Sequence, residues 1–407
     1  MNKEKAAKEL VPELRFPEFE NSGAWKQKKL SGFIEEHSER TGFNTKLPVY
    51  SSTREGLKPQ NEYYDGRNLE NKGEYGVVPV GHIVYRHMSD DDVFKFNINN
   101  LRTPIAVSKE YPVFSTPNLS PKFLISLLNE STSFLNFCRK QKKGGTRTRL
   151  YLSVLKTWGP YLPDEPEQTK IADCLDSIDQ LIEAHTNKLK TLENYKKGLM
   201  QQLFPAAGQN VPALRFPEFR DGPEWEEKSL RDIAQYKNGK AHESDISEDG
   251  SYIVVNSKYI SSDGKVVKHS DTARLLAKPN DILMVLSDVP NGKAIAKCLL
   301  VKESNKYTVN QRICIIRSIS VENQFLFHLL NRNTHFLKFD DGVKQTNLKK
   351  DDVLDCHLLV PRDRQEQNKI SQTLESIDLS IDDNKEKLTI LGQQKKGLMQ
   401  QLFPAMD

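Results

Sequence analysis

Residues 196–206 read KKGLMQQLFPA, and the same letters return unchanged at 395–405. Two more stretches recur at the same offset of 199 or 200 residues. VPELRFPEF at 11–19 returns as VPALRFPEF at 211–219, and EQTKIADCLDSID at 167–179 returns as EQNKISQTLESID at 366–378. So long an offset excludes a solenoid, whose repeats are about 20–50 residues long. The 407-residue chain is therefore two copies of one half.

The two copies are preserved unevenly. The stretches after 167 and 366 match closely, whereas residues 30–144 and 230–342 share only faint similarity, such as PKFLISLLN at 121–129 beside NQFLFHLLN at 323–331. Each half thus joins a common helical part to a divergent globular part. This pattern predicts two globular parts that do the same job on different targets.

Apolar residues follow a 4-3 spacing through both common helical parts. A narrow seam of this kind predicts two coiled-coil helices of about 37 residues, each about 55 Å long at 1.5 Å per residue. The alternative is an ordinary amphipathic helix on a globular core. The seam positions are Ile171, Ile178, His185, Leu192 and Leu199 in the first copy and Ile370, Ile377, Asn384, Leu391 and Leu398 in the second.

Chain geometry predicts that the two helices pair with each other in antiparallel fashion. The second globular part begins after the first helix and ends before the second, and a compact domain has its termini close together. A parallel pair would need a connection of roughly 55 Å. In the antiparallel pair Ile171 faces Leu398, and His185 and Asn384 form a polar layer on a pseudo-two-fold axis, where single polar residues fix register. A proton switch at His185 is the alternative.

Positive charge is concentrated in the divergent parts. The chain carries a net charge of +4, but residues 26–160 carry +8 and residues 226–362 carry +3, which leaves −7 elsewhere. Basic domains on an otherwise acidic frame predict a polyanionic partner.

The densest basic stretch is RKQKKGGTRTRL at 139–150. It follows a predicted helix from Pro121 to about Cys138, with Ser120 as the N-cap. Gly144 and Gly145 permit a tight turn whose backbone N–H groups can meet phosphate.

The second copy, KFDDGVKQTNLKK at 338–350, keeps the glycine turn and several basic and amide side chains, and such amides pair with adenine in the major groove. A solvated surface loop is the alternative. The candidate contacts to phosphates or bases are Arg139, Lys140, Lys142, Lys143, Gly144, Thr146, Arg147 and Arg149 in the first copy and Lys344, Gln345, Asn347, Lys349 and Lys350 in the second.

The remainder of each globular part predicts an α+β fold. Apolar or alternating runs bounded by Gly, Pro and Asn are typical of strands. They lie at 75–87, 103–116, 251–260, 281–286, 293–301 and 312–319. Residues at the ends of these runs, among them Tyr85, Arg86, His87, Lys258 and Tyr259, are expected to belong to the core or its rim rather than to a binding site.

The sequence contains no catalytic signature. P-loop, dinucleotide, zinc-protease and nucleophile-elbow patterns are absent. The carboxylates of Asp90, Asp91 and Asp92 could hold a cation, but a solvated acidic loop is the simpler explanation. A non-catalytic binding protein that needs no metal or cofactor of its own is the simplest hypothesis.

Composition excludes other classes of protein. The five cysteines have no C-x-x-C spacing, which excludes a disulfide scaffold and a cysteine zinc site. This cysteine usage predicts a protein located in the reducing cytoplasm. No run approaches the ~18 apolar residues of a membrane helix, and the mean hydropathy is −0.62. We therefore predict no membrane partner.

With these motifs the chain resembles, over nearly its full length, the specificity subunits of type I restriction–modification systems. The resemblance rests on features that occur twice, about 199 residues apart. They are P-E-F before a tryptophan (Pro17, Glu18, Phe19, Trp25; Pro217, Glu218, Phe219, Trp225), the glycine turn (Gly144; Gly342), a helix start (Pro163, Glu167, Gln168, Ile171; Pro361, Glu366, Gln367, Ile370) and the K-K-G-L-M-Q-Q-L-F end.

The resemblance implies two target-recognition domains, separated by antiparallel helices, that each read one half of a bipartite site in double-stranded DNA. It implies two modification subunits that bring S-adenosylmethionine, and two restriction subunits that bring ATP and Mg²⁺ chemistry. Helices of ~55 Å limit the half-site separation to about 16 base pairs. The expected division is an N-terminal segment 1–25, domain 26–160, helix 161–205, linker 206–225, domain 226–361 and helix 362–407.

Two other functions are weighed against this one. A two-headed protein-binding scaffold would show weak salt dependence, whereas a DNA reader loses affinity steeply as salt rises. A nuclease that uses Asp90–Asp92 would cut DNA with Mg²⁺ alone. Neither explains why the helices repeat while the globular parts diverge.

Overall fold

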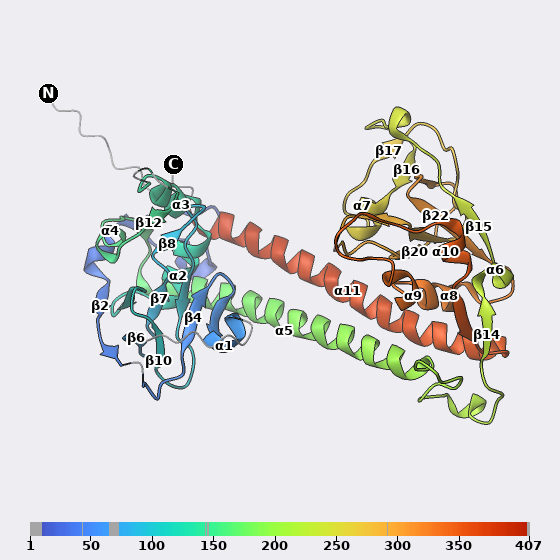
Figure 1. The fold of residues 1–407 in the computed structure, drawn as a ribbon. Coiled ribbons are helices and arrows are strands. Elements are labelled where there is room, and N and C mark those ends of the chain that lie inside the picture. The colour runs from blue at the N-terminus through green and yellow to red at the C-terminus, as the bar shows by residue number, and fades with distance from the viewer. Residues whose placement is uncertain are drawn as a thin grey trace. The chain divides into compact units, whose positions relative to one another are not determined.

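The computed structural model describes residues 10–42, 44–64, 73–142, 144, 146–290 and 292–404. The chain forms two compact units: Met1–Asn187 with Lys385–Asp407 (unit 1), and Lys188–Asn384 (unit 2). The division falls inside both long helices, α5 (Glu165–Leu203) and α11 (Arg364–Leu402), drawn green and red in Figure 1. Each unit is therefore a globular part together with a portion of both helices.

Unit 1 consists of small antiparallel sheets and short helices. Its sheets, in strand order, are β2 (Glu35–His37), β11 (Val113–Ser115), β7 (Ile83–Tyr85) and β9 (Phe96–Ile98); β10 (Ile105–Ser108), β6 (Tyr75–Val78) and β3 (Arg40–Thr41); β1 (Lys26–Gln27) with β13 (Tyr161–Leu162); β12 (Thr148–Arg149) with β8 (Met88–Ser89); and β4 (Tyr50–Thr53) with β5 (Gly56–Pro59). Its helices before α5 are the 3-10 turns Pro17–Phe19 and Leu30–Gly32, then α1 (Gln60–Tyr63), α2 (Pro121–Glu130), α3 (Thr132–Arg139) and α4 (Leu152–Leu155).

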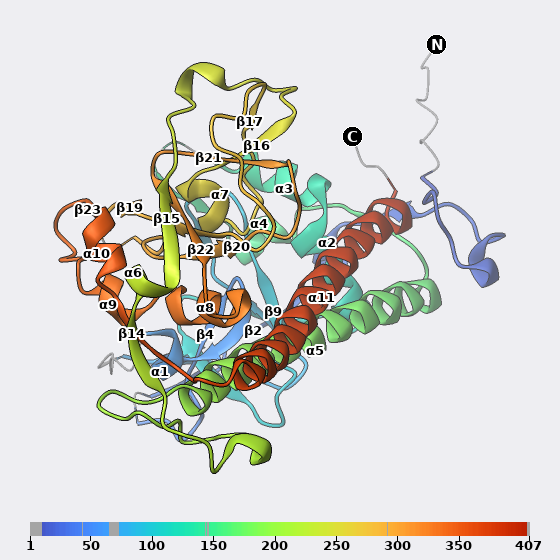
Figure 2. The same ribbon diagram turned by 90° about the vertical axis from the view of Figure 1, so that its right-hand side faces the viewer.

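Unit 2 (Figure 2) repeats the four-stranded sheet and two of the two-stranded sheets of unit 1 in the same strand order, whereas its three-stranded sheet is paired differently. Its sheets are β15 (Ala234–Asn238), β22 (Ile313–Ser318), β18 (Ile282–Val285) and β20 (Cys298–Leu300); β17 (His269–Ser270), β16 (Tyr252–Val255) and β21 (Tyr307–Val309); β14 (Glu226–Ser229) with β24 (His357–Val360); and β19 (Ser287–Asp288) with β23 (Thr346–Asn347). β16 and β21 are parallel. Its helices before α11 are the 3-10 turns Pro217–Phe219 and Glu243–Asp245, then α6 (Leu230–Ile233), α7 (Ser257–Ser261), α8 (Asn323–Leu330), α9 (Thr334–Leu337) and α10 (Lys350–Leu354).

Several of the predicted elements are wrong in part. The runs 75–87 and 103–116 each form two strands, β6 and β7 in the first and β10 and β11 in the second, and the run 293–301 is a strand only over β20. In two other elements a side-chain cap explains the difference. The run 251–260 is a strand only to Val255, because the Asn256 side chain accepts a hydrogen bond from the Tyr259 N–H and starts α7. Lys258 and Tyr259 therefore lie on a helix. The predicted helix from Pro121 to Cys138 is two helices, because Ser131 is extended and caps α3.

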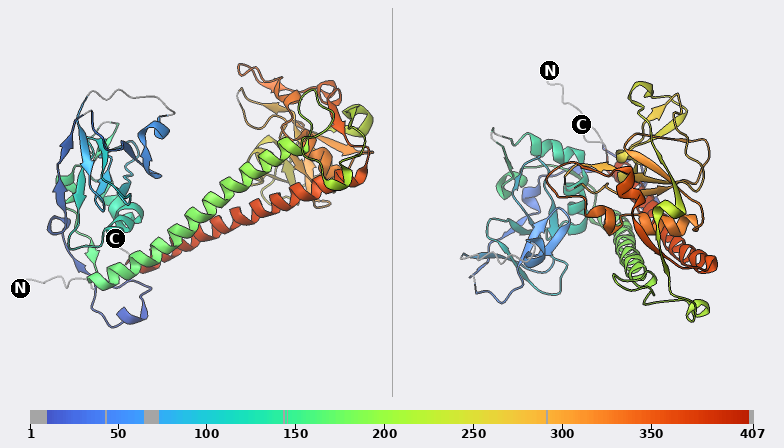
Figure 3. Two further views of the ribbon diagram at one scale, coloured as in Figure 1. Left: turned by 90° about the horizontal axis from the view of Figure 1, so that it is seen from below. Right: turned by 45° about the vertical axis from the view of Figure 1, so that its right-hand side comes forward.

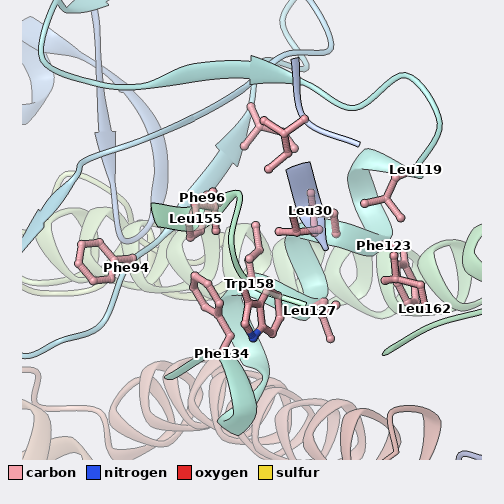
Figure 4. Close-up of a cluster of buried hydrophobic side chains, with 14 of the residues drawn as sticks. Leu30, Phe94, Phe96, Leu119, Phe123, Leu127, Phe134, Leu155, Trp158 and Leu162 are labelled. Carbon is pink, nitrogen blue, oxygen red and sulfur yellow. The ribbon is translucent and has the colours of Figure 1, made fainter. Parts of the chain in front are cut away.

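The core of unit 1 draws on both long helices. Figure 4 shows its aromatic part, where Phe134 and Trp158 lie 4.7 Å apart between ring centroids. Ile171 at the start of α5 and Leu402 and Phe403 at the end of α11 are buried in the same cluster. Figure 3 (left) shows α5 beginning, and α11 ending, at this globular part. Each fully buried Leu or Phe side chain contributes about 1.5–3 kcal/mol of transfer free energy.

Unit 2 mirrors this arrangement with the helices exchanged. Its core buries Leu203 from the end of α5 and Ile370 and Leu374 from the start of α11. Since the start of one helix lies with the end of the other in both units, the predicted antiparallel pairing is confirmed. Interhelical ion pairs follow the same rule, with Asp179 bonded to Lys395 in unit 1 and Asp378 to Lys196 in unit 2.

Burial along the predicted seam is uneven. Most seam side chains are half-buried, because two helices alone leave part of each seam side chain uncovered. Among the seam positions, Ile171, Ile370, Ile377 and Asn384 are buried, and Ile178, His185, Leu192, Leu199, Leu391 and Leu398 are half-buried.

The repeated E-Q pair at the start of each long helix makes the same bonds in both units. Glu167 accepts both arms of Arg15 at 2.7 and 2.6 Å and the Trp25 indole N–H at 3.4 Å. Its neighbour Gln168 accepts from the Ser120 N–H at 3.2 Å, which ties α2 to α5. The equivalent bonds in unit 2 join Glu366 to Arg215 and Trp225, and Gln367 to the N–H of Glu322.

The same repeated N-terminal stretch also contacts the end of the other helix. The Leu14 N–H donates to the Gln401 carbonyl and the Leu214 N–H to the Gln202 carbonyl, each at 2.9 Å. The LRFPEF segments (residues 14–19 and 214–219) therefore connect the start of one long helix to the end of the other.

Replacing Glu167 by Gln tests this arrangement. The substitution leaves the Arg15 guanidinium buried without its countercharge, and breaking a buried pair costs about 3–5 kcal/mol. We expect thermal and urea unfolding to show a loss of that size for Glu167→Gln. The control Glu183→Gln, at an exposed position of the same helix, should change stability by less than about 0.5 kcal/mol; equal effects would contradict the assignment.

His328 on α8 makes the stability of unit 2 sensitive to acid. Burial, and secondarily Lys196, lowers the pKa of this imidazole to about 4. The unfolded chain takes up a proton below about pH 6.5, so stability should fall as the pH drops from about 6.5 to 4, by at most about 1.4 kcal/mol per pH unit. His328→Met should flatten this dependence in melts between pH 7.5 and 4.5, whereas the exposed His357→Gln should not.

Candidate nucleic-acid interface

The basic loop of unit 1 and its counterpart in unit 2 each lead into a short strand that pairs with one other strand of the same unit. We call this two-stranded pair the ladder. Thr148 pairs with Ser89 where β12 meets β8, and Thr346 pairs with Asp288 where β23 meets β19. The two loops therefore occupy equivalent places in the two units, although their sequences differ.

The glycine turns have the backbone that the sequence predicts. Gly144 has φ +76° and Gly342 has φ +70°, a conformation that side chains disfavour. In unit 2 the Asp341 carboxylate accepts the N–H groups of Val343 and Lys344, and these bonds lower the pKa of Asp341. The predicted contacts Lys143 and Gly145 lie outside the described residues.

Side chains alternate along both ladder strands. In unit 1 Arg147 and Arg149 are exposed while Thr148 is buried between them. In unit 2 Gln345 and Asn347 are likewise exposed on either side of the buried Thr346. They correspond in position to Arg147 and Arg149. Most of the other predicted contacts are also exposed; they are Arg139, Lys140, Lys142, Gly144, Thr146, Lys344, Lys349 and Lys350.

The amides of unit 2 are held in place by each other. The Gln345 Nε2 donates to the Ser287 hydroxyl at 2.7 Å and to the Asn347 side-chain oxygen Oδ1 at 3.4 Å. Lys349 and Lys350 follow directly at the start of α10, where the Lys349 N–H is bonded to Asp352. The structure thus brings amide and basic side chains together on one short stretch.

The acidic triplet of unit 1 faces the basic loop. Asp90 bonds to Arg147 at 2.7 Å, Asp92 lies 3.8 Å from the Lys142 ammonium, and Asp91 pairs with Arg54. The Arg54 guanidinium lowers the pKa of Asp91 to about 2. The three carboxylates are therefore each paired with a basic side chain of the protein. Within the described ranges no group of His, Cys, Asp and Glu has the arrangement of a metal site.

One exposed residue near the ladder, Tyr151, was missed as a candidate, whereas His87 is buried as predicted. Tyr151 is 50% exposed beside Arg149, and its ring stacks on His87 with centroids 5.6 Å apart. Continuing the alternation that begins at Thr148 would have placed Tyr151 on the exposed face, so the signal was present in the sequence.

Buried thiols offer no nucleophile. Burial raises the pKa of Cys138, Cys314 and Cys356 to about 12, and it raises that of Cys298 as well. Such groups stay protonated at neutral pH and behave as small apolar side chains.

The parts of the chain that the structure describes contain no helix long and apolar enough to cross a bilayer.

Comparison with known proteins points to one family. The sequence matches the family model described as "Type I restriction modification DNA specificity domain" over residues 62–194 and again over 223–391. The specificity subunit of the type I restriction enzyme MjaVIII from Methanocaldococcus jannaschii is 24% identical over 289 residues. That alignment covers 66% of this chain and 66% of the relative, so the chain spans just under two thirds of its length.

Solved structures show the same fold at low sequence identity. The S subunit of a type I restriction–modification system from M. genitalium superposes with a TM-score of 0.66 at 14% identity, over 98% of this chain and 100% of that chain. A structure from work on complex assembly and conformational transition of the type I R-M system gives 0.50 at 15% identity, over 94% and 98%.

The contact between Asp90 and Arg147 leads to a prediction about polyanion binding. Asp90→Asn frees Arg147, and because an exposed pair contributes at most about 1 kcal/mol, the fold should be unaffected. We expect duplex DNA of arbitrary sequence to bind about two- to fivefold more tightly at 0.1 M salt, measured by fluorescence anisotropy. Glu110→Gln, which removes an exposed carboxylate elsewhere in unit 1, is the control; if it had the same effect, net charge alone would be responsible.

Proposed function

We propose that this chain, which belongs to the type I restriction modification DNA specificity family, reads a bipartite DNA sequence with one half-site for each globular part. The resemblance seen in the sequence is thereby confirmed. Members of this family recognise the DNA target of a type I system and are not themselves catalytic. How this chain divides that task between its parts is the content of the proposal.

Residues 26–160 and 226–361 are the proposed target-recognition domains. The observation that carries this assignment is that two divergent sequences form the same four-stranded sheet and the same small ladder, with a basic or amide-rich ladder strand at the equivalent place. One scaffold with two different surfaces is what a protein needs in order to read two different half-sites.

The exposed side chains around the ladder strands are the proposed DNA contacts. Arginine and lysine of the loop in unit 1 grip phosphates, which supplies affinity and positions the protein. The amides of Gln345 and Asn347 are suited to base edges, because Asn and Gln pair with the N6 and N7 groups of adenine. The turn at Gly144 lets the backbone come close to a phosphate.

The long helices are proposed to set the half-site spacing and to dock two modification subunits. Each unit leaves two apolar side chains of its helices largely exposed: Leu181 and Ile390 in unit 1, and Leu379 and Tyr195 in unit 2. The repeated helix sequences at the two ends suit two copies of one partner. In this proposal S-adenosylmethionine, ATP and Mg²⁺ are held by the modification and restriction subunits in the cytoplasm, and this chain needs none of them.

Mapping methylated adenine in the native genome, with and without this gene, tests the proposal. We expect deletion to remove methylation at one bipartite motif, because the modification subunits then lack their guide. Exchange of residues 26–150 for those of another family member should change one half of that motif and leave the other intact. Unchanged methylation in the deletion strain, together with salt-insensitive DNA binding by the purified complex, would contradict it.

A further inference from the structure

We propose that the base preference of each domain is set by three outward-facing positions of the extended segment that contains its ladder strand. They are 147, 149 and 151 in unit 1 and 345, 347 and 349 in unit 2, and we call them the strip. This inference rests on the proposed function and names the residues through which the domains differ.

Alternation along the strand defines the strip in unit 1. Successive side chains of a strand point to opposite faces. Thr148 and Leu150 are 1% and 0% exposed, whereas Arg147, Arg149 and Tyr151 all face solvent. Since β12 lies at the edge of its ladder with β8, the strip is presented on the surface of the domain.

Unit 2 presents its strip in the same way. Thr346 and Leu348 are both buried, and Gln345, Asn347 and Lys349 are exposed. The register is equivalent, because the Leu348 N–H donates to the Leu286 carbonyl at 2.8 Å just as the Leu150 N–H donates to the His87 carbonyl.

The buried residues of this segment are identical in the two units, whereas the exposed residues differ. R-T-R-L-Y in unit 1 corresponds to Q-T-N-L-K in unit 2. Threonine and leucine are retained where their side chains are buried, while the exposed positions that alternate with them differ at every place. A surface of this kind can change its ligand without changing the fold.

The side chains of the strip are of the types that read base edges. Arginine pairs with the O6 and N7 groups of guanine, asparagine and glutamine pair with adenine, and apolar groups contact the thymine methyl. Each good pair contributes about 1–3 kcal/mol of discrimination. Three such positions per domain are enough to distinguish one short half-site from another.

Tyr151 is the member of the strip that is most clearly built for contact. Its ring stacks at 26° on His87, which is 92% buried and whose Nδ1 finds no hydrogen-bond partner among the described residues. With one face covered, the ring is held in one orientation and still leaves half of its surface exposed. A large aromatic held rigidly at the surface adds contact area with little loss of side-chain entropy.

The experiment exchanges the strips and leaves the buried letters in place. The variant R147Q/R149N/Y151K gives unit 1 the outward letters of unit 2, and Q345R/N347R/K349Y makes the reciprocal change. The control K26Q/K109N removes two positive charges from exposed positions of unit 1 that lie outside the strip. Each full-length variant replaces the native gene, and methylated adenine is mapped across the genome.

We expect each exchange to alter the bases of one half-site only, a different half for each variant, and K26Q/K109N to leave both halves unchanged. If an exchange abolishes methylation, binding of the purified complex to the native site is compared with binding to a site with one half scrambled. Discrimination at that half should fall at least tenfold, and discrimination at the other half should persist.

An unaltered motif, or unaltered discrimination at both halves, would overturn the proposal. It would mean that the strip contacts only phosphates and does not read bases. Loss of discrimination at both halves would also overturn it, provided that thermal melting shows an intact fold. Failure of the proposed function itself is recognised separately, because deletion of the native gene would then leave every methylated motif in place.

Discussion

One buried glutamate at the first turn of each long helix holds the architecture together. Glu167 and Glu366 each accept two bonds from an arginine and one from a tryptophan, and the arginine belongs to an LRFPEF segment that also bonds to the last turn of the other helix. A buried carboxylate is tolerated only when it is paired and hydrogen-bonded. Neither unit can therefore form without the start of one long helix and the end of the other.

This constraint explains why the chain repeats where it does. The repeated stretches are the LRFPEF segments, the E-Q helix starts and the K-K-G-L-M-Q-Q-L-F ends. They all meet at the bonds of Glu167 or Glu366, which we call the glutamate clamp, or in the core beside it. Gln168 and Gln367 extend the clamp by holding the first turn of α2 and α8. The globular parts keep only what those contacts and their cores require, so their surfaces were free to diverge.

In two places where the sequence pattern misled, a single polar side chain had decided the local structure. Apolar residues resume at Tyr259 and Ile260, yet Asn256 caps a helix there, and Ser131 divides a stretch whose periodicity is helical throughout. The acidic triplet gave the least guidance. Asp90 and Asp92 lie fifty or more residues from the basic residues they meet, and no local pattern predicts a long-range ion pair.

The sequence by itself determined the duplication, the two long helices, their antiparallel pairing and the family, because these depend on repeats, on periodicity and on the short distance between the termini of a domain. It also located the glycine turn and the basic loop. The tertiary structure alone decided that both loops end in equivalent ladders, that Arg147 meets Asp90, and that Tyr151 stacks on His87. Those facts depend on which distant strands become neighbours, and that choice is made by core packing.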